Sequence, residues 1–203
     1  MILSRERIIK IVFFMSGFSA LIYQIAWQRM LFTAFGVDLE SITIIISVFM
    51  AGLGVGAWGG GRIADKFPTK IIGFFALTEI GIGSFGILSP SLIEITQNYF
   101  LHSSTLTIAF ANFILLLFPT FLMGSTLPLL TQYLNQYFNN VGHNIGWLYF
   151  TNTLGAATAC IVTGFILFNS FTLIDVIYIA GIINYLVAFT VFITYGRKET
   201  KND

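Results

Sequence analysis

Long apolar stretches dominate the chain, and short polar or Pro/Gly-containing breaks separate them. A segment needs about 20 consecutive, mostly apolar residues to cross the hydrocarbon core of a bilayer as an α-helix. Stretches of this kind recur along the chain and predict transmembrane helices at residues 8–35, 41–64, 70–88, 104–133, 145–168 and 174–195. The predicted fold is therefore all-α, a polytopic six-helix bundle forming a single domain over residues 1–203.

Proline positions shape the third and fourth predicted helices. Ser89 and Pro90 are expected to close the third helix. The following residues, 91–100, are then expected to form a short helix lying at the membrane interface. Pro119 and Pro128 fall inside the fourth helix, where each removes a backbone hydrogen bond, so they predict a kink.

The first stretch begins with the basic residues Arg5, Arg7 and Lys10 ahead of an apolar centre. A cleaved signal peptide has the same kind of start. Apolar residues continue well beyond Ala20, however, and nothing typical of a secreted domain follows. We therefore interpret this stretch as a retained transmembrane helix.

Composition supports a membrane protein. The chain is 56% hydrophobic and only 9% charged, whereas soluble domains average about 25% charged residues to cover their aqueous surface. The net charge of +1 says nothing about nucleic acid, but the chain has no basic patch with interleaved aromatics, so we expect no nucleic-acid partner and take the lipid bilayer as the expected one. The single cysteine, Cys160, lies in an apolar run, which excludes a disulfide framework and a thiol metal site.

Basic residues predict the orientation. Nine of the ten Lys and Arg residues fall on one side of a six-helix arrangement. They are Arg5, Arg7, Lys10, Arg62, Lys66, Lys70, Arg197, Lys198 and Lys201. Under the positive-inside rule this side, with both termini, is cytoplasmic. The remaining one, Arg29, is expected either to snorkel to the outer interface or to pair with Asp38, Glu40 or a substrate carboxylate.

Small residues follow one face of the second and fifth predicted helices, at four-residue spacing. They are Gly52, Gly56, Gly60, Gly155 and Ala159. Such stripes let helix backbones approach closely in a membrane. One interpretation is ordinary packing within the chain. The other, which we carry forward, is that these residues belong to an interface with another subunit of a homo-oligomer or to a sliding interface. Both can hold, because a helix has more than one face.

The loop after the second helix carries a recognisable motif, GGGRIADKFPTK at residues 59–70. It resembles the loop signature of the major facilitator superfamily, with Pro68 where that family usually has Gly. The resemblance implies a gating role for Gly61, Arg62, Asp65 and Lys66, with Asp65 latching the cytoplasmic side in one state. The alternative is a positive-inside loop that contains an Asp. Two three-helix units of opposite orientation would also match the inverted repeat inside each half of such a transporter.

Four further stretches carry a closer resemblance. In order they are SGFSALIYQIAWQR (16–29), FMAGLGVGAWGGGRIAD (49–65), FPTFLMGSTLPLL (118–130) and GWLYFTNTLGAATA (146–159). Together they resemble the membrane domain of bacterial and archaeal spermidine synthase-like membrane proteins, in which a Rossmann-like aminopropyltransferase domain usually follows. The sequence ends at Asp203, where that domain would begin, so we expect no enzyme activity and no cofactor. The resemblance implies a prokaryotic inner membrane.

Polar groups inside apolar helices are the candidate functional residues, because burying them in a bilayer is costly. Glu79 lies about 14 Å into the third helix, near mid-membrane, and could bind a cationic amine, carry a proton or pair with a neighbouring helix. Further candidates for substrate binding are Tyr23, Gln24, Trp27, Gln28, Asn112, Tyr149 and Asn152. The alternative is that the carboxyl and the lone amides hold helices together. No metal-binding or nucleophilic constellation is expected.

We expect a half-size transporter that works as a homo-oligomer by alternating access. Its first and fourth helices would line the pathway, its second and fifth would slide at the interface, and its substrate would be a small amine or polyamine-like metabolite. The alternative is a membrane anchor or regulatory subunit for a separate, soluble spermidine synthase-like enzyme.

Overall fold

The computed structural model describes residues 2–35, 38–100, 102–138 and 140–196. All its regular elements are helical. They are α1 (Ile2–Phe35), α2 (Asp38–Lys66), α3 (Ile71–Tyr99), α4 (Thr105–Asn135), α5 (Val141–Val162), a π-helical segment (Thr163–Leu167), α6 (Phe168–Ser170), α7 (Leu173–Val191) and a second π-helical segment (Phe192–Gly196). The first π segment joins α5 to α6, so these three elements form the fifth long helix. The sixth long helix consists of α7 and the second π segment.

Within the described residues, six helices are long and apolar enough to cross a membrane. The chain is therefore a multi-pass membrane protein with an all-α bundle, as the apolar stretches predicted. Most predicted helix ends lie within about four residues of the observed ones, and α1 begins earlier, at Ile2.

The third helix is the main departure. Residues 91–100 were expected to form a separate interfacial helix, and this is wrong, because α3 continues through Pro90 to Tyr99. Proline lacks the N–H that would bond the carbonyl four residues earlier, which here belongs to Gly86. Ser89 supplies the missing donor, since its Oγ donates to the Gly86 carbonyl at 2.7 Å. The same Oγ accepts from Trp27 Nε1 at 2.7 Å.

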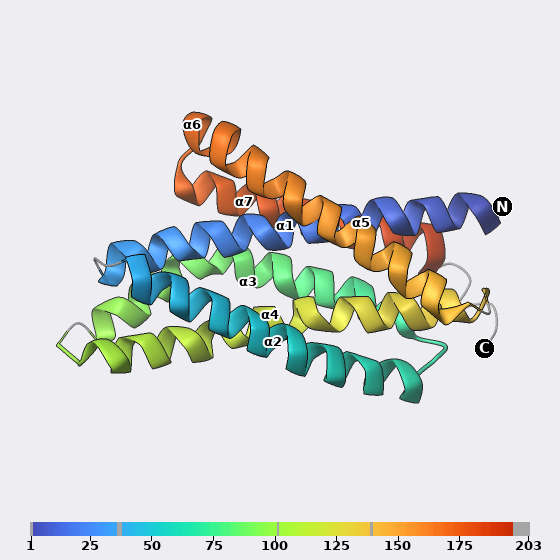
Figure 1. Cartoon of the computed structure of the whole chain (residues 1–203), viewed down its shortest axis with the longest axis horizontal. Coiled ribbons are helices and arrows are strands. Elements are labelled where there is room, and N and C mark those ends of the chain that lie inside the picture. The colour runs from blue at the N-terminus through green and yellow to red at the C-terminus, as the bar shows by residue number, and fades with distance from the viewer. Residues whose placement is uncertain (1, 36–37, 101, 139, 197–203) are drawn as a thin grey trace.

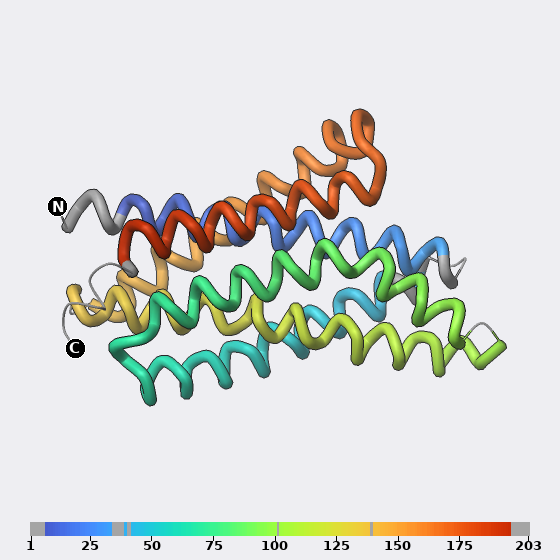
Figure 2. The backbone as a smooth tube through the Cα atoms, turned by 180° about the vertical axis from the view of Figure 1, so that it is seen from behind, coloured from blue at the N-terminus to red at the C-terminus, as the bar shows by residue number. Residues whose placement is uncertain are grey.

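The helices alternate in direction, which gives the bundle two distinct ends. The starts of α1, α3 and α5 lie at one end with the α2–α3 and α4–α5 connections, and we call it the termini end (Figure 1). The α1–α2, α3–α4 and α6–α7 connections lie at the other, the far end. The opposite views in Figures 1 and 2 place α2 and α5 on one side of the bundle and α3 and α7 on the other.

Helix pairing follows a symmetric scheme. The closest pairs are α2 with α4 and α1 with α5; next come α3 with α7, α3 with α4 and α7 with α1. Exchanging α1 with α4, α2 with α5 and α3 with α7, which is the sixth long helix, turns each of these pairs into a pair of the same list. Because exchanged helices run in opposite directions, the pairing is that of a 3+3 inverted repeat.

The predicted stripes of small residues form the two closest pairs. A Cβ at Gly52, Gly56 or Gly60 would strike Thr120, Phe121 or Ser125 of α4. A Cβ at Gly155 would strike the backbone of Phe14 in α1, and Ala159 is fully buried in the core. These small residues therefore pack within the chain. A contact of α2 and α5 with another subunit through their other faces stays a prediction. Spacing alone does not tell which helix a stripe faces, because close approach favours small residues in either case.

Two hydrophobic clusters make up the core, one toward each end. The far-end cluster is built around Tyr23, Trp27 and Phe49, and the termini-end cluster around Phe13, Phe75 and Leu130. Between them lies a level of buried polar residues. They are Ser16, Ser19, Glu79, Ser125, Thr126 and Asn184. This polar layer positions the candidate site.

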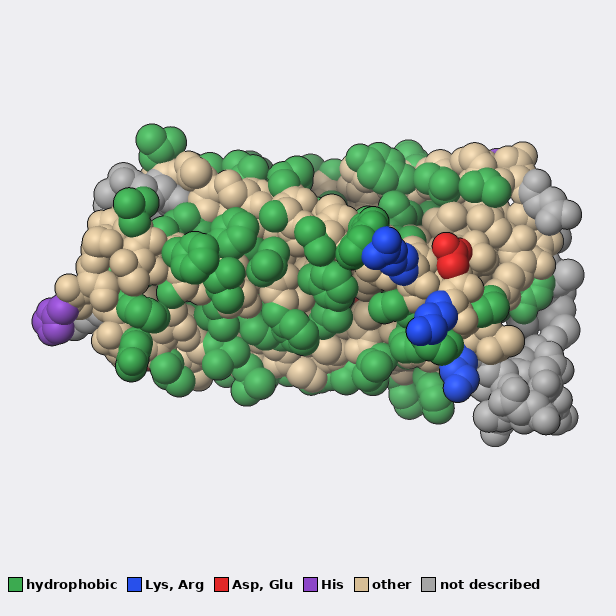
Figure 3. Space-filling view, turned by 90° about the horizontal axis from the view of Figure 1, so that it is seen from below, with side chains coloured by type: hydrophobic (Ala, Val, Ile, Leu, Met, Phe, Trp, Pro, Cys, Tyr) green, Lys and Arg blue, Asp and Glu red, His purple; other side chains and the backbone are tan. Residues whose placement is uncertain are grey.

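On the face of the bundle drawn in Figure 3, charged side chains are sparse and gather toward the termini end. Among the described side chains, those at this end include Lys10, Arg62, Lys66 and Lys70, as the positive-inside prediction requires. The side chains of Arg5, Asp38, Glu40, Arg197, Lys198 and Lys201 lie outside the described residues.

A polar cavity beside a buried carboxyl as the candidate functional site

Glu79 is the centre of the polar layer. Its side chain is fully buried, and both of its carboxyl oxygens accept hydrogen bonds. Ser16 of α1 donates its Oγ–H to Oε1 at 2.6 Å, and Asn184 of α7 donates from Nδ2 to Oε2 at 2.7 Å. One carboxyl thus joins three helices that are distant in the sequence.

The depth of Glu79 differs from the prediction. It lies about 12 Å from the start of α3, whose 29 residues span about 43 Å. Glu79 is therefore in the termini half of the helix and not at its middle. The prediction placed it centrally because it ended the helix at Pro90.

A cavity of about 130 Å³ adjoins this cluster. All six long helices contribute to its lining. Its polar lining residues are Ser16, Gln24, Thr126, Asn152 and Asn184, and most of the rest is aliphatic. Leu21, Gln24, Leu53 and Asn152 are only partly buried, so this part of the wall reaches the surface of the single chain.

Ser16 and Asn184 belong both to the cavity wall and to the carboxyl cluster, so they connect the cavity to Glu79. Asn184 is 1% exposed, and its Oδ1 has no hydrogen-bond partner among the described residues. Thr126 donates its hydroxyl to the Met123 carbonyl at 2.7 Å, which leaves its oxygen free to accept. The wall therefore offers several acceptors and, within the described lining, no Lys, Arg or His.

The predicted substrate residues separate into three groups. Gln24 and Asn152 line the cavity, and Glu79 borders it through its partners. Gln28 lines a different pocket, at the far end. The structure thus brings together three of the eight candidates.

The other four lie elsewhere. Tyr23 and Trp27 stack with ring centroids 5.0 Å apart and pack against α3, where Tyr23 abuts Gly86. Asn112 is buried in α4 and donates to the Ile108 carbonyl at 2.9 Å. Tyr149 is 62% exposed on the side of α5 and does not line the cavity, so its role in substrate binding stays a prediction. It precedes Asn152 by three residues, but only Asn152 turns toward α1, where it abuts Gly17.

Ser16, Thr126 and Asn184 were not predicted as site residues. A signal for the first was present in the spacing. Residues 16, 17, 20, 21 and 24 form one face of α1, and all of them line the cavity. A serine and a glutamine on one face of an otherwise apolar helix mark that face as polar.

The predicted gating residues lie on the last turns of α2. Asp65 is exposed, and no ion pair links it to any described residue. Arg62 lies over the Trp58 ring at 3.8 Å from the centroid, and Lys66 lies 5.4 Å from the Phe67 ring centroid. The α2–α3 turn is tied to α4 by Gln136, whose Nε2 donates to the Pro68 carbonyl at 2.7 Å. A latch made by Asp65 stays a prediction.

Comparisons with protein-family models, with curated proteins and with solved structures give no match to this chain. The resemblance to spermidine synthase-like membrane proteins therefore stays a prediction. Any inference about function starts from the cavity and its polar wall.

Proposed function

We propose that the chain is a half-size transporter of small cationic amines that works as a homodimer. The observation that carries this proposal is the cavity beside Glu79. Five polar side chains surround this space between the helices, and polar groups left without partners are costly in a membrane, so a polar substrate in the space would pair with them.

The shape of the cavity supports the dimer. Its wall includes the mid-sections of α1 and α4, with α2 and α5 on either side, and its partly buried residues lie on α1, α2 and α5. The two halves of a major facilitator transporter are related by an axis along the membrane normal. A second copy placed by such an axis would bring its own cavity to face the cavity of the first copy. Rocking of the two copies would then expose the shared space to each side of the membrane in turn. The termini end would face the cytoplasm.

The chemistry of the wall favours a hydrogen-bond donor with positive charge. Asn184 Oδ1, Thr126 Oγ1 and Ser16 Oγ can accept, and the carboxyl of Glu79 lies directly behind two of them. A water occupies about 30 Å³ in the liquid, so 130 Å³ holds about four waters or a monoamine of a few heavy atoms. A longer, polyamine-like substrate would need the cavities of both copies.

Uptake into proteoliposomes tests the substrate. We expect radiolabelled ethylamine to accumulate with the parent protein and to fall to background with Glu79→Gln, which keeps the shape but removes the charge. Glu94→Gln is the matched control, because Glu94 lies on the same helix but is exposed near the far end. Equal uptake by both variants, or none by the parent, would contradict amine transport.

Cross-linking in membranes tests the dimer. Cys160 is exposed on α5, about 28 Å from the start of that helix, and Ser47 is exposed on α2 at about the same distance from its end. We expect the Ser47→Cys variant to form a dimer in which the new cysteine of one copy is cross-linked to Cys160 of the other copy. The cross-linked dimer should vanish when Cys160 is also replaced by Ser. Leu88→Cys, at similar depth on α3, is the control. No cross-link, or the same yield with the control, would exclude this pairing and favour the anchor function.

A further inference from the structure

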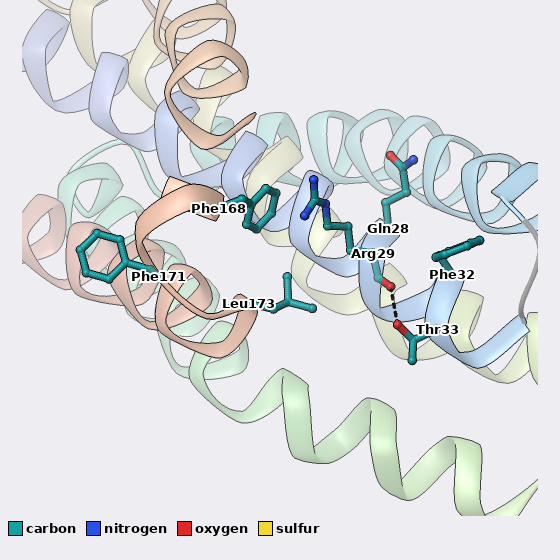
Figure 4. Close-up of a pocket in the computed structure, with 7 residues that line it drawn as sticks. All are labelled: Gln28, Arg29, Phe32, Thr33, Phe168, Phe171 and Leu173. Carbon is teal, nitrogen blue, oxygen red and sulfur yellow. Dashed lines mark hydrogen bonds between the residues drawn. The ribbon is translucent and has the colours of Figure 1, made fainter. Parts of the chain in front are cut away.

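A second pocket lies at the far end, away from the cavity. It has a volume of about 520 Å³ and is lined by Gln28, Arg29, Phe32, Thr33, Phe168, Phe171 and Leu173 (Figure 4). Helix α1 provides one wall, and the turn from α6 into α7 provides the other. The volume falls in the range of ligand sites, about 300–1,000 Å³.

Arg29 is the charged group of this pocket. Figure 4 shows its guanidinium extending toward Phe168, and the guanidinium carbon lies 3.8 Å from the ring centroid. The ring covers one side of the guanidinium, while Arg29 as a whole remains exposed. No described carboxylate pairs with it. Its N–H groups are therefore available for the paired hydrogen bonds that a guanidinium makes to a phosphate or carboxylate.

The apolar part of the pocket is exposed as well. Phe32 is 42% exposed and Phe171 is 50% exposed, and both line the same space as Arg29. A free inorganic anion would neutralise the arginine and leave these rings uncovered. A phospholipid would fit the charged and the apolar parts of the pocket together, because its phosphate pairs with the arginine and its glycerol and acyl chain cover the rings.

The depth of the pocket fits a lipid headgroup. Arg29 lies about 9 Å along α1 from its far end at Phe35. The interfacial region of a bilayer is about 5–8 Å thick on each side, and a long arginine side chain reaches it by snorkelling. Arg29 is also the basic residue that the orientation rule does not explain, since the other basic residues whose side chains the structure describes lie toward the termini end.

We propose that this pocket binds an anionic phospholipid of the far-end leaflet, with Arg29 holding its phosphate. Gln28 supplies a further amide donor from the neighbouring position on α1. Thr33 already donates its hydroxyl to the Arg29 carbonyl at 3.1 Å, so it can only accept. The site is separate from the amine cavity and does not depend on transport.

Native mass spectrometry of the full chain in mild detergent, titrated with phosphatidylglycerol, tests the proposal. We expect one lipid to bind most tightly and Arg29→Gln to weaken that binding about tenfold, the loss typical of charge-assisted hydrogen bonds. Arg29→Lys should also weaken it, because an ammonium does not form two parallel bonds. Size-exclusion profiles and helical content confirm that both variants fold.

Arg62→Gln is the matched control. Arg62 lies over Trp58 at the same 3.8 Å, but near the termini end and outside this pocket. Unchanged lipid binding in this variant supports a specific site. Equal losses in Arg29→Gln and Arg62→Gln, no loss in Arg29→Gln, or displacement of the lipid by millimolar inorganic phosphate would each overturn the proposal.

Discussion

Replacing Glu79 by leucine or by glutamine separates its structural role from its charge. Leucine has a similar volume but removes both hydrogen bonds, to Ser16 and to Asn184. Side-chain hydrogen bonds between membrane helices contribute about 0.6 kcal/mol on average and up to about 1.7 kcal/mol. Two such bonds therefore contribute about 1–3 kcal/mol. Asn184 would lose the hydrogen-bond partner of its Nδ2, Glu79, and stay buried, which adds about 1 kcal/mol or more. We expect Glu79→Leu to lower the free energy of unfolding by about 2–4 kcal/mol.

Glutamine should be tolerated for a reason specific to Asn184. The Ser16 hydroxyl can still donate to the glutamine oxygen, but the glutamine NH₂ would face the Asn184 NH₂, and two donors repel. Because Asn184 Oδ1 has no other partner among the described residues, its amide can turn over and accept instead. Glutamine also carries no charge, so it avoids the cost of burying one. We expect Glu79→Gln to change stability by less than about 1 kcal/mol.

Unfolding in mixed micelles with increasing SDS, followed by circular dichroism, measures these differences. A double-mutant cycle with Asn184→Leu should give a coupling of about 1 kcal/mol between positions 79 and 184. If Glu79→Gln lowered the free energy of unfolding as much as Glu79→Leu, the proposed rotation of the Asn184 amide would be refuted. A coupling near zero would refute the energetic importance of the 2.7 Å bond.

Three further substitutions test the packing. Ser89→Ala should lower stability by about 2 kcal/mol in the same assay, because it leaves Trp27 Nε1 and the Gly86 carbonyl without their partner; an unchanged midpoint would contradict this. Gly56→Leu should separate α2 from α4 and abolish the folded, monodisperse peak in size exclusion, whereas Gly54→Leu should be tolerated, since nothing lies within 4 Å of its Cβ position. Thr172→Ala should cost about 1 kcal/mol through loss of the capping box that starts α7, which the midpoint of thermal unfolding reports.

The fold was predictable because hydropathy and length fix where a chain can cross a bilayer. Pro90 shows where that reasoning ends. From the sequence alone, Ser89 followed by Pro90 predicts the end of a helix. The hydrogen bonds of Ser89 with the Gly86 carbonyl and with Trp27 explain why α3 continues. The bond to Trp27 joins positions more than 60 residues apart, so local sequence does not reveal it.

The site was partly predictable for a related reason. A polar residue in an apolar helix signals a special position, which is how Glu79, Gln24 and Asn152 were found. The direction in which it points depends on which face of the helix packs inward. Tyr149 and Asn152 are close in sequence, but the approach of α5 to α1 at Gly17 turns only the second toward the cavity.

The two partners of Glu79 also bear on how the protein is made. An acidic residue costs up to about 3 kcal/mol to insert at the centre of an isolated membrane helix, and less toward one end, where Glu79 lies. During synthesis α1 emerges before α3, so the Ser16 hydroxyl is already present to meet the carboxyl. Asn184 belongs to the last helix, and its bond to Glu79 forms only when α7 docks. Completion of the bundle and full shielding of the carboxyl are therefore the same event, and a nascent chain that stalls before α7 presents a half-shielded acid to the quality-control machinery of the membrane.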